Sequence, residues 1–415
     1  MLRPLISDMA GRAAPRLTRL LPGRRGPDLD HLCKRVILPS LPVADEDMTR
    51  IAIWEKGRRL VRQDHWDELS RRVQLADDAR LCTPGGLPET ILLALGAHGD
   101  VVAAATDALH DGCPPEPGGL RALEEAQDER PDDYVPALVA ALAHLRIGRA
   151  WLETGEAAGM AGASDALRQA KGHTEKAGEL IAFFDAEDLD APSLAAARAA
   201  LSEGPPNAQI PDGMIKAYRD LITLDPDCPQ HMRDYGAVLA RTYGDPDLLD
   251  NEAGHVAGLT RPIWGDGGYA WVYLDALAID PNALLAIDPD RFIAGLRALL
   301  GNRSNQFLAN EIAALCALKM APGEAHPHAA EAKRAALHGC LDWVLAQHLH
   351  ELHPRLWADT ETHHSLSTPR PGHRALIAMG RKRALQCIAG FFADQLSDGS
   401  SIAFSPAGMY RLPAF

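Results

Sequence analysis

The sequence has few aromatic side chains, no long apolar run and no closely paired cysteines. No window approaches the about 18 consecutive apolar residues of a membrane-spanning helix, so no transmembrane segment is expected. The seven cysteines are odd in number, widely separated and never in a CxxC pair, which argues against a disulfide framework and a zinc knuckle. We expect them to be small buried side chains in a reducing cytoplasm.

Alanine and leucine dominate the apolar residues, whereas the β-branched and aromatic strand formers are less common. Hydrophobic residues make up 47% and charged residues 24% of the 415 positions, which is ordinary for a soluble folded protein. Unbranched side chains lose little rotamer freedom in a helix. The predicted fold class is therefore all-α, with an irregular array of antiparallel helix pairs (a solenoid or a helical bundle) and little or no sheet.

Positive charge is scarce beyond the first 35 residues. These carry a formal charge of +5 and the remainder −19, for a net charge of −14. An acidic body argues against nonspecific nucleic-acid binding. Residues 1–26 combine arginines with leucines at helical spacing, so we expect a basic arm that is disordered or loosely docked. Weak attachment of this arm to an anionic membrane surface is an alternative.

Proline and glycine clusters divide the chain. The strongest breakers predict three regions: a basic arm and linker, partly disordered, at 1–44, a helical-pair region at 45–206, and a helical region at 207–415. The glycine-rich link at 245–266 is expected to be partly irregular, a second irregular segment is expected around 360–372, and the last dozen residues are expected to be extended. Helical spacing predicts helices at 45–61, 66–75, 88–111 (a pair), after 131, 163–184, 192–202, 212–223, 229–242, 267–279, 290–301, 305–319, 327–353 and 372–396.

The aromatic residues gather in one stretch, residues 231–281, which we interpret as the centre of the molecule. Six of the fourteen Trp and Tyr residues lie there: Tyr235, Tyr243, Trp264, Tyr269, Trp271 and Tyr273. The segment 267–279 of this aromatic centre is apolar on nearly all sides, which predicts a helix buried between neighbouring helices.

Three segments resemble parts of tetratricopeptide repeats. Ala217–Pro226 and Tyr273–Pro281 each place an aromatic residue before a closing Asp-Pro, and 172–184 has the small-residue and aromatic spacing of a second repeat helix. The two Asp-Pro endings are 55 residues apart, unlike the about 34 of a regular repeat. The resemblance implies an irregular helical array and, through that fold class, binding of a protein or peptide.

Histidines cluster near the carboxyl end, but no metal site or cofactor is predicted. His350 and His353 have ligand spacing, yet there is no HExxH motif, and we interpret the group as solvated or core histidines. The acidic run at 245–252 lacks the glycine of a calcium loop. The group contains His348, His350, His353, His363, His364 and His373.

The predicted function is non-catalytic binding of a protein or peptide by a helical repeat scaffold in the cytoplasm. The candidate site is a groove lined by rings and polar groups of the aromatic centre, with Trp264 expected to be the most exposed ring. The simpler interpretation is that the rings pack between helices. Alternatives are an enzyme or small-ligand pocket around Tyr235, Trp264 and Tyr269, with Asp234 and Asp266 as acid or base, and a peripheral membrane protein. The candidate residues are His231, Arg233, Asp234, Tyr235, Tyr243, Arg261, Trp264, Asp266 and Tyr269.

Overall fold

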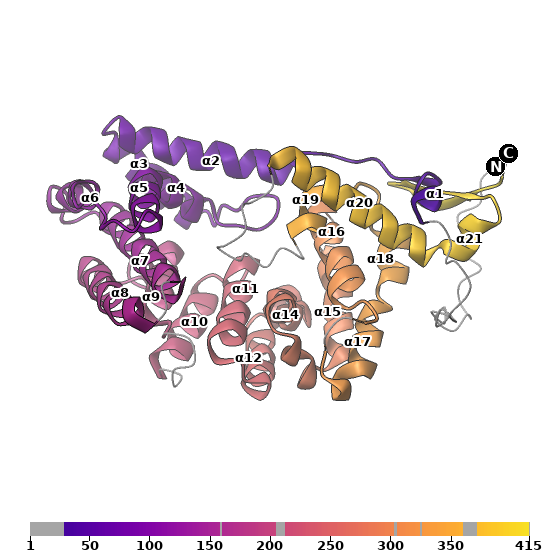
Figure 1. Ribbon diagram of the computed structural model, residues 1–415. Helices are drawn as coiled ribbons and strands as arrows, with labels where there is room; N and C mark the ends of the chain where they lie inside the picture. Colours follow the sequence, from indigo (N-terminus) through magenta and orange to yellow (C-terminus); the bar gives the residue numbers. More distant parts are fainter. Residues whose placement is uncertain are drawn as a thin grey trace. The chain divides into compact units, whose positions relative to one another are not determined.

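The computed structural model describes residues 29–157, 160–204, 212–302, 305–323, 326–359 and 372–414. Helices account for 73% and strands for 5% of the residues that the structure describes (Figure 1). The predicted all-α character is therefore confirmed. The basic arm at 1–26, with its membrane alternative, lies outside the described residues, as do His363, His364 and most of the 360–372 link.

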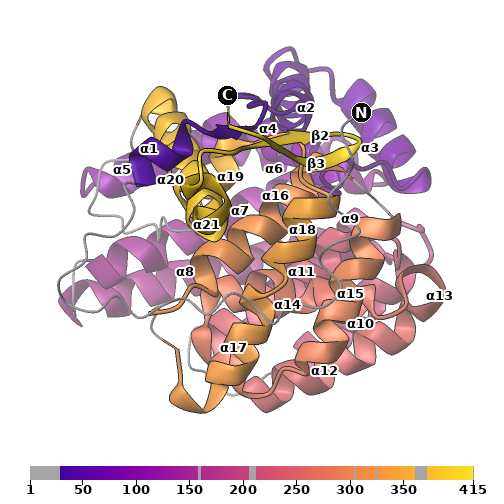
Figure 2. The same cartoon turned by 90° about the vertical axis from the view of Figure 1, so that its right-hand side faces the viewer.

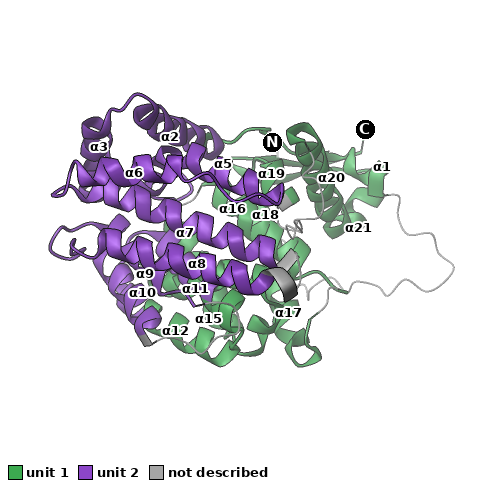
Figure 3. Cartoon of the chain, turned by 60° about the vertical axis from the view of Figure 1, so that its left-hand side comes forward, with its two compact units in different colours: residues 1–45, 239–257, 264–415 green, residues 46–238, 258–263 purple. Residues whose placement is uncertain are grey.

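The chain forms two compact units, coloured separately in Figure 3. Unit 2 comprises residues 46–238 and 258–263, and unit 1 comprises 1–45, 239–257 and 264–415. The sequence predicts a boundary after residue 206, whereas residues 212–238 group with the helices that precede them. Helix α10 (Asp212–Leu224) packs on α9 (Pro192–Ser202), and α11 (Pro229–Val238) packs on α10.

Unit 2 is built around α7, a long apolar helix that contacts α3, α4, α5, α6, α8 and α9. Tyr134–Gly155 is long and apolar enough to cross a membrane, and the bent pair α4 and α5 passes the same test. Most of the α7 segment is buried inside the fold, as expected for a core helix. The helices are α2 (Asp45–Arg62), α3 (Trp66–Asp78), α4 (Glu89–Ala97), α5 (Gly99–His110), α6 (Gly118–Asp128), α7 (Tyr134–Ala157), α8 (Met160–Ile181), α9 (Pro192–Ser202), α10 (Asp212–Leu224) and α11 (Pro229–Val238).

Close helix approach in unit 2 depends on glycine. A Cβ on Gly96 of α4 would lie 1.9 Å from the carbonyl oxygen of Trp54 in α2, and a Cβ on Gly57 would lie 2.1 Å from that of Leu93. The two backbones therefore touch directly, which fixes one face of α2 against α4.

Unit 1 contains the aromatic helix α14 and a carboxyl-terminal helical group with a small sheet. Its elements are α1 (Leu29–Cys33), β1 (Val36–Ile37), the π-helix η2 (Leu239–Tyr243), most of α12 (Pro246–Leu259), α14 (Gly267–Ile279), η3 (Pro281–Leu285), α15 (Pro289–Asn302), α16 (Gln306–Ala314), the π-helix η4 (Leu315–Lys319), η5 (His328–Ala330), α17 (Glu331–His338), α18 (Leu341–Gln347), α19 (Pro354–Asp359), α20 (His373–Phe391), α21 (Ala393–Ser397), β2 (Ser401–Ser405) and β3 (Gly408–Leu412). The short helix α13 (Arg261–Trp264) is divided: residues 261–263 belong to unit 2 and Trp264 to unit 1.

The sheet has the order β1-β2-β3, with β1 and β2 parallel and β2 and β3 antiparallel. It lies beside α20 and α21 (Figure 2). Ile402 and Phe404 alternate with less buried neighbours, which is the period-two pattern of a half-buried strand. The expectation of an extended carboxyl end is confirmed.

The link at 245–266, expected to be partly irregular, is mostly helical, because α12 and α13 occupy most of it. Asp245 Oδ1 accepts the backbone N–H groups of Asp247 and Leu248, and Pro246 occupies the first turn, where no donor is needed. Apolar residues then recur at three- and four-residue steps and are buried: Leu249, Ala253, Val256 and Ala257. The predicted helix at 327–353 is also interrupted, as η5, α17 and α18.

Candidate functional site

The residues predicted to line a groove are divided between the two units and differ widely in exposure. The rings of Tyr235, Trp264 and Tyr269 are buried, and only Arg261 and Asp266 are exposed. His231 is buried, and Arg233, Asp234 and Tyr243 are intermediate. The rings therefore belong to the cores of their units.

Trp264 corrects our expectation most clearly. It is only 2% exposed, and its ring packs edge to face on Trp271, with ring centres 5.8 Å apart. Gly265 follows with a φ of 56°, a left-handed conformation that turns the chain directly into α14. The prediction that Trp264 is the most exposed ring is wrong, because the turn places the indole against α14.

The tyrosines of α14 form a buried polar network rather than an open surface. Tyr269 donates to Asp250 Oδ1, and Tyr273 donates to the same oxygen at 3.1 Å. Tyr269 Oη in turn accepts the backbone N–H of Asp288 at 2.9 Å. Burial raises the pKa of both phenols, so the rings stay neutral and serve as packing groups with satisfied hydroxyls.

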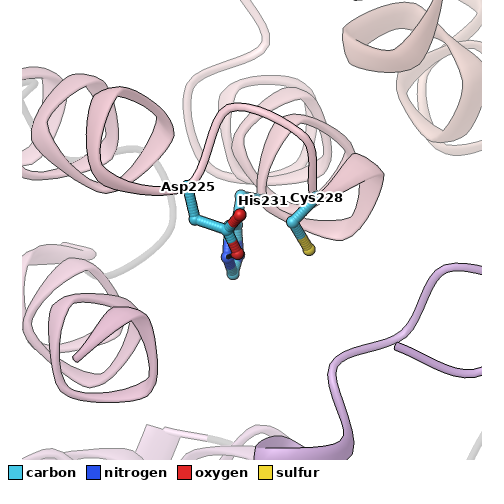
Figure 4. A group of neighbouring side chains, drawn as sticks. All are labelled: Asp225, Cys228 and His231. Atoms are coloured by element: carbon cyan, nitrogen blue, oxygen red, sulfur yellow. Dashed lines mark hydrogen bonds and ion pairs between the residues drawn. The ribbon is translucent and has the colours of Figure 1, made fainter. Parts of the chain in front are cut away.

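A different set of side chains in unit 2 brings together the chemistry of a site. Asp225, Cys228 and His231 stand on the turn between α10 and α11, and all three point to the same side of it (Figure 4). Their ligand atoms, a carboxylate oxygen, a sulfur and a ring nitrogen, lie within 4.8 Å of one another. His231 Nε2 lies 3.2 Å from Asp225 Oδ2. All three residues are buried, with exposures of 5%, 2% and 2%.

The turn is shaped by its sequence. Helix α10 ends at Leu224, because Pro226 cannot continue the hydrogen-bond ladder, and Pro229 then occupies the first position of α11. Cys228 and His231 are three residues apart, so they face the same side of the first turn of α11.

A second cysteine approaches this group from a distant loop. Burial raises the pKa of the Cys228 thiol, and its hydrogen bond to the Cys82 sulfur adds to the effect. The backbone N–H of His231 also donates to Cys228 and acts in the opposite direction, since it stabilises the thiolate. Cys82 begins the tight loop at 82–88, in which Thr83 N donates to Leu87 O and Gly86 N to Thr83 O.

One cation stands beside the group. Arg80 Nε lies 3.9 Å from Asp225 Oδ1, and the same guanidinium donates to the Asp190 carboxylate and to the Asp77 carbonyl. The adjoining pocket, lined by Asp77, Arg80, Cys82, Ser193, Asp225 and His231 among others, has room for about one water molecule or ion. An organic substrate would not fit it.

Asp77 lines this pocket and holds neighbouring helices together. Its carboxylate accepts from Tyr134 Oη at 2.7 Å and from the backbone N–H and hydroxyl of Ser193 at 3.0 and 2.5 Å. It thereby joins α3, α7 and α9. Burial raises the pKa of this carboxyl, and the three hydrogen bonds partly offset the rise.

The carboxyl-terminal histidines that the structure describes do not form a common site. His353 pairs with Glu351 at 2.9 Å, and His348 packs edge to face on Trp343. Among the residues that the structure describes, Asp225, Cys228 and His231 are the group identified with metal-ligand geometry. The sequence signal for this group is a D-x2-C-x2-H spacing across a helix start. A CxxC pattern does not reveal it, because its ligands are of three different residue types.

Comparison with known proteins adds no assignment: no family model, no curated protein and no solved structure matches this chain.

Proposed function

We propose that this protein is a non-catalytic helical scaffold in the cytoplasm that binds a protein or peptide partner. The observation that carries the proposal is an apolar patch on α2, formed by Met48 and Ile51. Their side chains are 60% and 57% exposed, in a helix whose Gly57 and Leu60 are buried. Two large apolar side chains three residues apart form a contiguous surface, unlike a single exposed residue.

The α2 patch is presented on a rigid support. The direct backbone contact of α2 with α4 at Gly57 and Gly96 leaves the opposite face of α2 outward. Farther along the helix, Arg62 pairs with Asp100 of α5, which adds a second fixed point. A preorganised helix face loses little conformational entropy on binding, so apolar contacts there contribute efficiently to affinity.

The repeat-like organisation is part of the same proposal. Helix α10 ends before Asp225-Pro226 and α14 before Asp280-Pro281, at the Asp-Pro signals of the sequence. Such endings suit antiparallel helix pairs of tetratricopeptide type, a class that binds peptides. Cytoplasmic residence is supported by the cysteines: all seven lie within the described ranges and none forms a disulfide.

The test is quantitative affinity capture from native cells with the full-length chain as bait. A Met48→Glu/Ile51→Glu double variant is compared with the wild type. The matched control is Leu75→Glu, which replaces an exposed leucine of α3 among polar neighbours. Loss of the α2 patch should cost about 2 kcal/mol of binding, roughly a 30-fold loss of affinity.

The expected result is one or more proteins lost from the double variant and retained by wild type and control, with direct binding then confirmed by calorimetry. A dimer seen by light scattering and disrupted only in the double variant would identify the partner as a second copy. Identical captured sets and identical masses for all three proteins would overturn the proposal.

A further inference from the structure

We propose that Asp225, Cys228 and His231, together with Cys82, form a structural zinc site in unit 2. This inference is independent of the α2 patch. It concerns a buried group whose residue types are the common zinc ligands, namely thiolate, imidazole and carboxylate.

Three of the four ligands of such a site already lie close together. In a tetrahedral zinc centre with bonds of about 2.0–2.3 Å, neighbouring ligand atoms lie about 3.3–3.8 Å apart. The ligand atoms of Asp225, Cys228 and His231 lie within 4.8 Å of one another, and the His231–Asp225 pair is already at 3.2 Å. An ion would need to draw the group together by roughly 1 Å, within the reach of side-chain rotation.

Cys82 is the proposed fourth ligand. It interacts with the Cys228 thiol and lines the pocket beside Asp225 and His231. Its sulfur lies outside the group whose ligand atoms are all within 4.8 Å of one another, so its side chain would have to rotate toward the ion. The pocket beside Cys82, Asp225 and His231 accepts a particle of about the size of one water molecule. That size suits an ion. A mixed sulfur and nitrogen donor set selects zinc over magnesium or calcium, which require oxygen ligands.

Charge balance supports the same ion. Two thiolates, one carboxylate and Zn²⁺ sum to one negative charge. The guanidinium of Arg80, 3.9 Å from Asp225, offsets part of it, because the same group also pairs with Asp190. Binding converts two thiols to thiolates and releases their two protons to solvent, while the imidazole binds through a neutral nitrogen. The backbone N–H of His231 acts to lower the pKa of the Cys228 thiol and would therefore stabilise its thiolate.

With four protein ligands and no open position, the ion would be structural rather than catalytic. It would join the 82–88 loop to the α10–α11 turn, two segments far apart in the sequence. The buried Cys228 Sγ already lies 4.0 Å from the carbonyl oxygen of Gly86 in that loop.

The direct test uses the full-length protein purified without a metal-affinity tag, stripped with a chelator and reloaded with Zn²⁺ or Co²⁺. We expect one zinc per chain by mass spectrometry of the metal. With cobalt we expect the intense thiolate-to-metal charge-transfer band of a tetrahedral thiolate site. A protein that binds no zinc, or whose cobalt spectrum lacks the charge-transfer band, overturns the proposal.

Variants identify the ligands. Cys82→Ser, Cys228→Ser and His231→Gln should each weaken zinc binding beyond the ~10–100-fold that outer-shell changes cost, measured against a chromophoric chelator. Cys340→Ser, which replaces a buried cysteine of unit 1, is the matched control and should bind zinc normally.

Normal zinc affinity in Cys82→Ser overturns the four-ligand site. If a variant fails to fold, the wild-type cobalt spectrum still decides. A Cys82–Cys228 disulfide in freshly isolated, metal-free protein would also overturn the site.

Discussion

Replacing His98 with leucine should remove an acid-induced loss of stability. His98 lies between α4 and α5 and is 2% exposed, and neither ring nitrogen bonds to any other residue in the described part of the chain. Burial lowers the pKa of this imidazole to about 3, and the nearby charge of Arg146 contributes in the same direction. The folded protein therefore holds a neutral ring at pH values where an unfolded chain would bind a proton.

The sign and size of this change in stability follow from the difference between the folded and unfolded pKa values of His98. The unfolded pKa is about 6.5 and the folded value is lower, so the stability due to His98 is fully present above about pH 6.5 and is lost as pH falls toward 3. Between about pH 8 and about pH 5 the loss amounts to about 2 kcal/mol for this residue alone. Other histidines titrate too, so the informative quantity is the difference between wild type and variant.

The assay is urea denaturation at both pH values, followed by far-ultraviolet circular dichroism. Wild type should lose about 2 kcal/mol more than His98→Leu on acidification. His110→Leu, which replaces an exposed histidine at the end of α5, should behave as wild type. Equal losses in wild type and His98→Leu would refute the argument, since they would mean that this ring is already accessible to protons in the folded state.

Substitutions at Trp264, Gly96 and Asp77 test the packing further. Trp264→Ala should destabilise unit 1 by about 3–5 kcal/mol in a urea titration, and a cost below about 1 kcal/mol would show that the indole is not core. Gly96→Ala should cost about 1–3 kcal/mol of stability, because the new Cβ clashes with the backbone of α2. Gly172→Ala, which has open space around it in α8, should instead stabilise the protein by about 0.5–1 kcal/mol. Equal changes in melting temperature for the two variants would contradict the close approach of α2 and α4. Asp77→Ala should cost about 1–3 kcal/mol for each partner left unsatisfied. Because burial raises the pKa of Asp77, wild type should gain stability from this group as pH falls through its folded value, and Asp77→Asn should lack that gain.

Helices with a clear apolar period and a strong terminator were predictable from the sequence. Helix α14 was expected at 267–279 and is observed there, because it is apolar nearly all round and followed by Asp-Pro. Helix α12 is not predicted, because the glycines of the 245–266 link favoured partly irregular structure there. In fact Asp245 caps the helix and Pro246 starts it. The same residue types stop or start a helix according to their position, which composition does not reveal.

The candidate site was less predictable than the fold. The binding groove was predicted at the aromatic residues because such residues often lie at interfaces. In a chain with so few aromatic rings, however, the rings pack in the core. Asp225, Cys228 and His231 carry a visible three-residue spacing, but nothing in the sequence indicates that Cys82 joins them. That contact depends on how the 82–88 loop packs, and it is a tertiary property.

X-ray absorption at the zinc edge of the reloaded full-length protein tests the proposed metal site most directly. The account predicts two sulfur neighbours at about 2.3 Å and two nitrogen or oxygen neighbours at about 2.0–2.2 Å. A spectrum with only oxygen and nitrogen neighbours would contradict it, because zinc would then be bound away from Cys82 and Cys228.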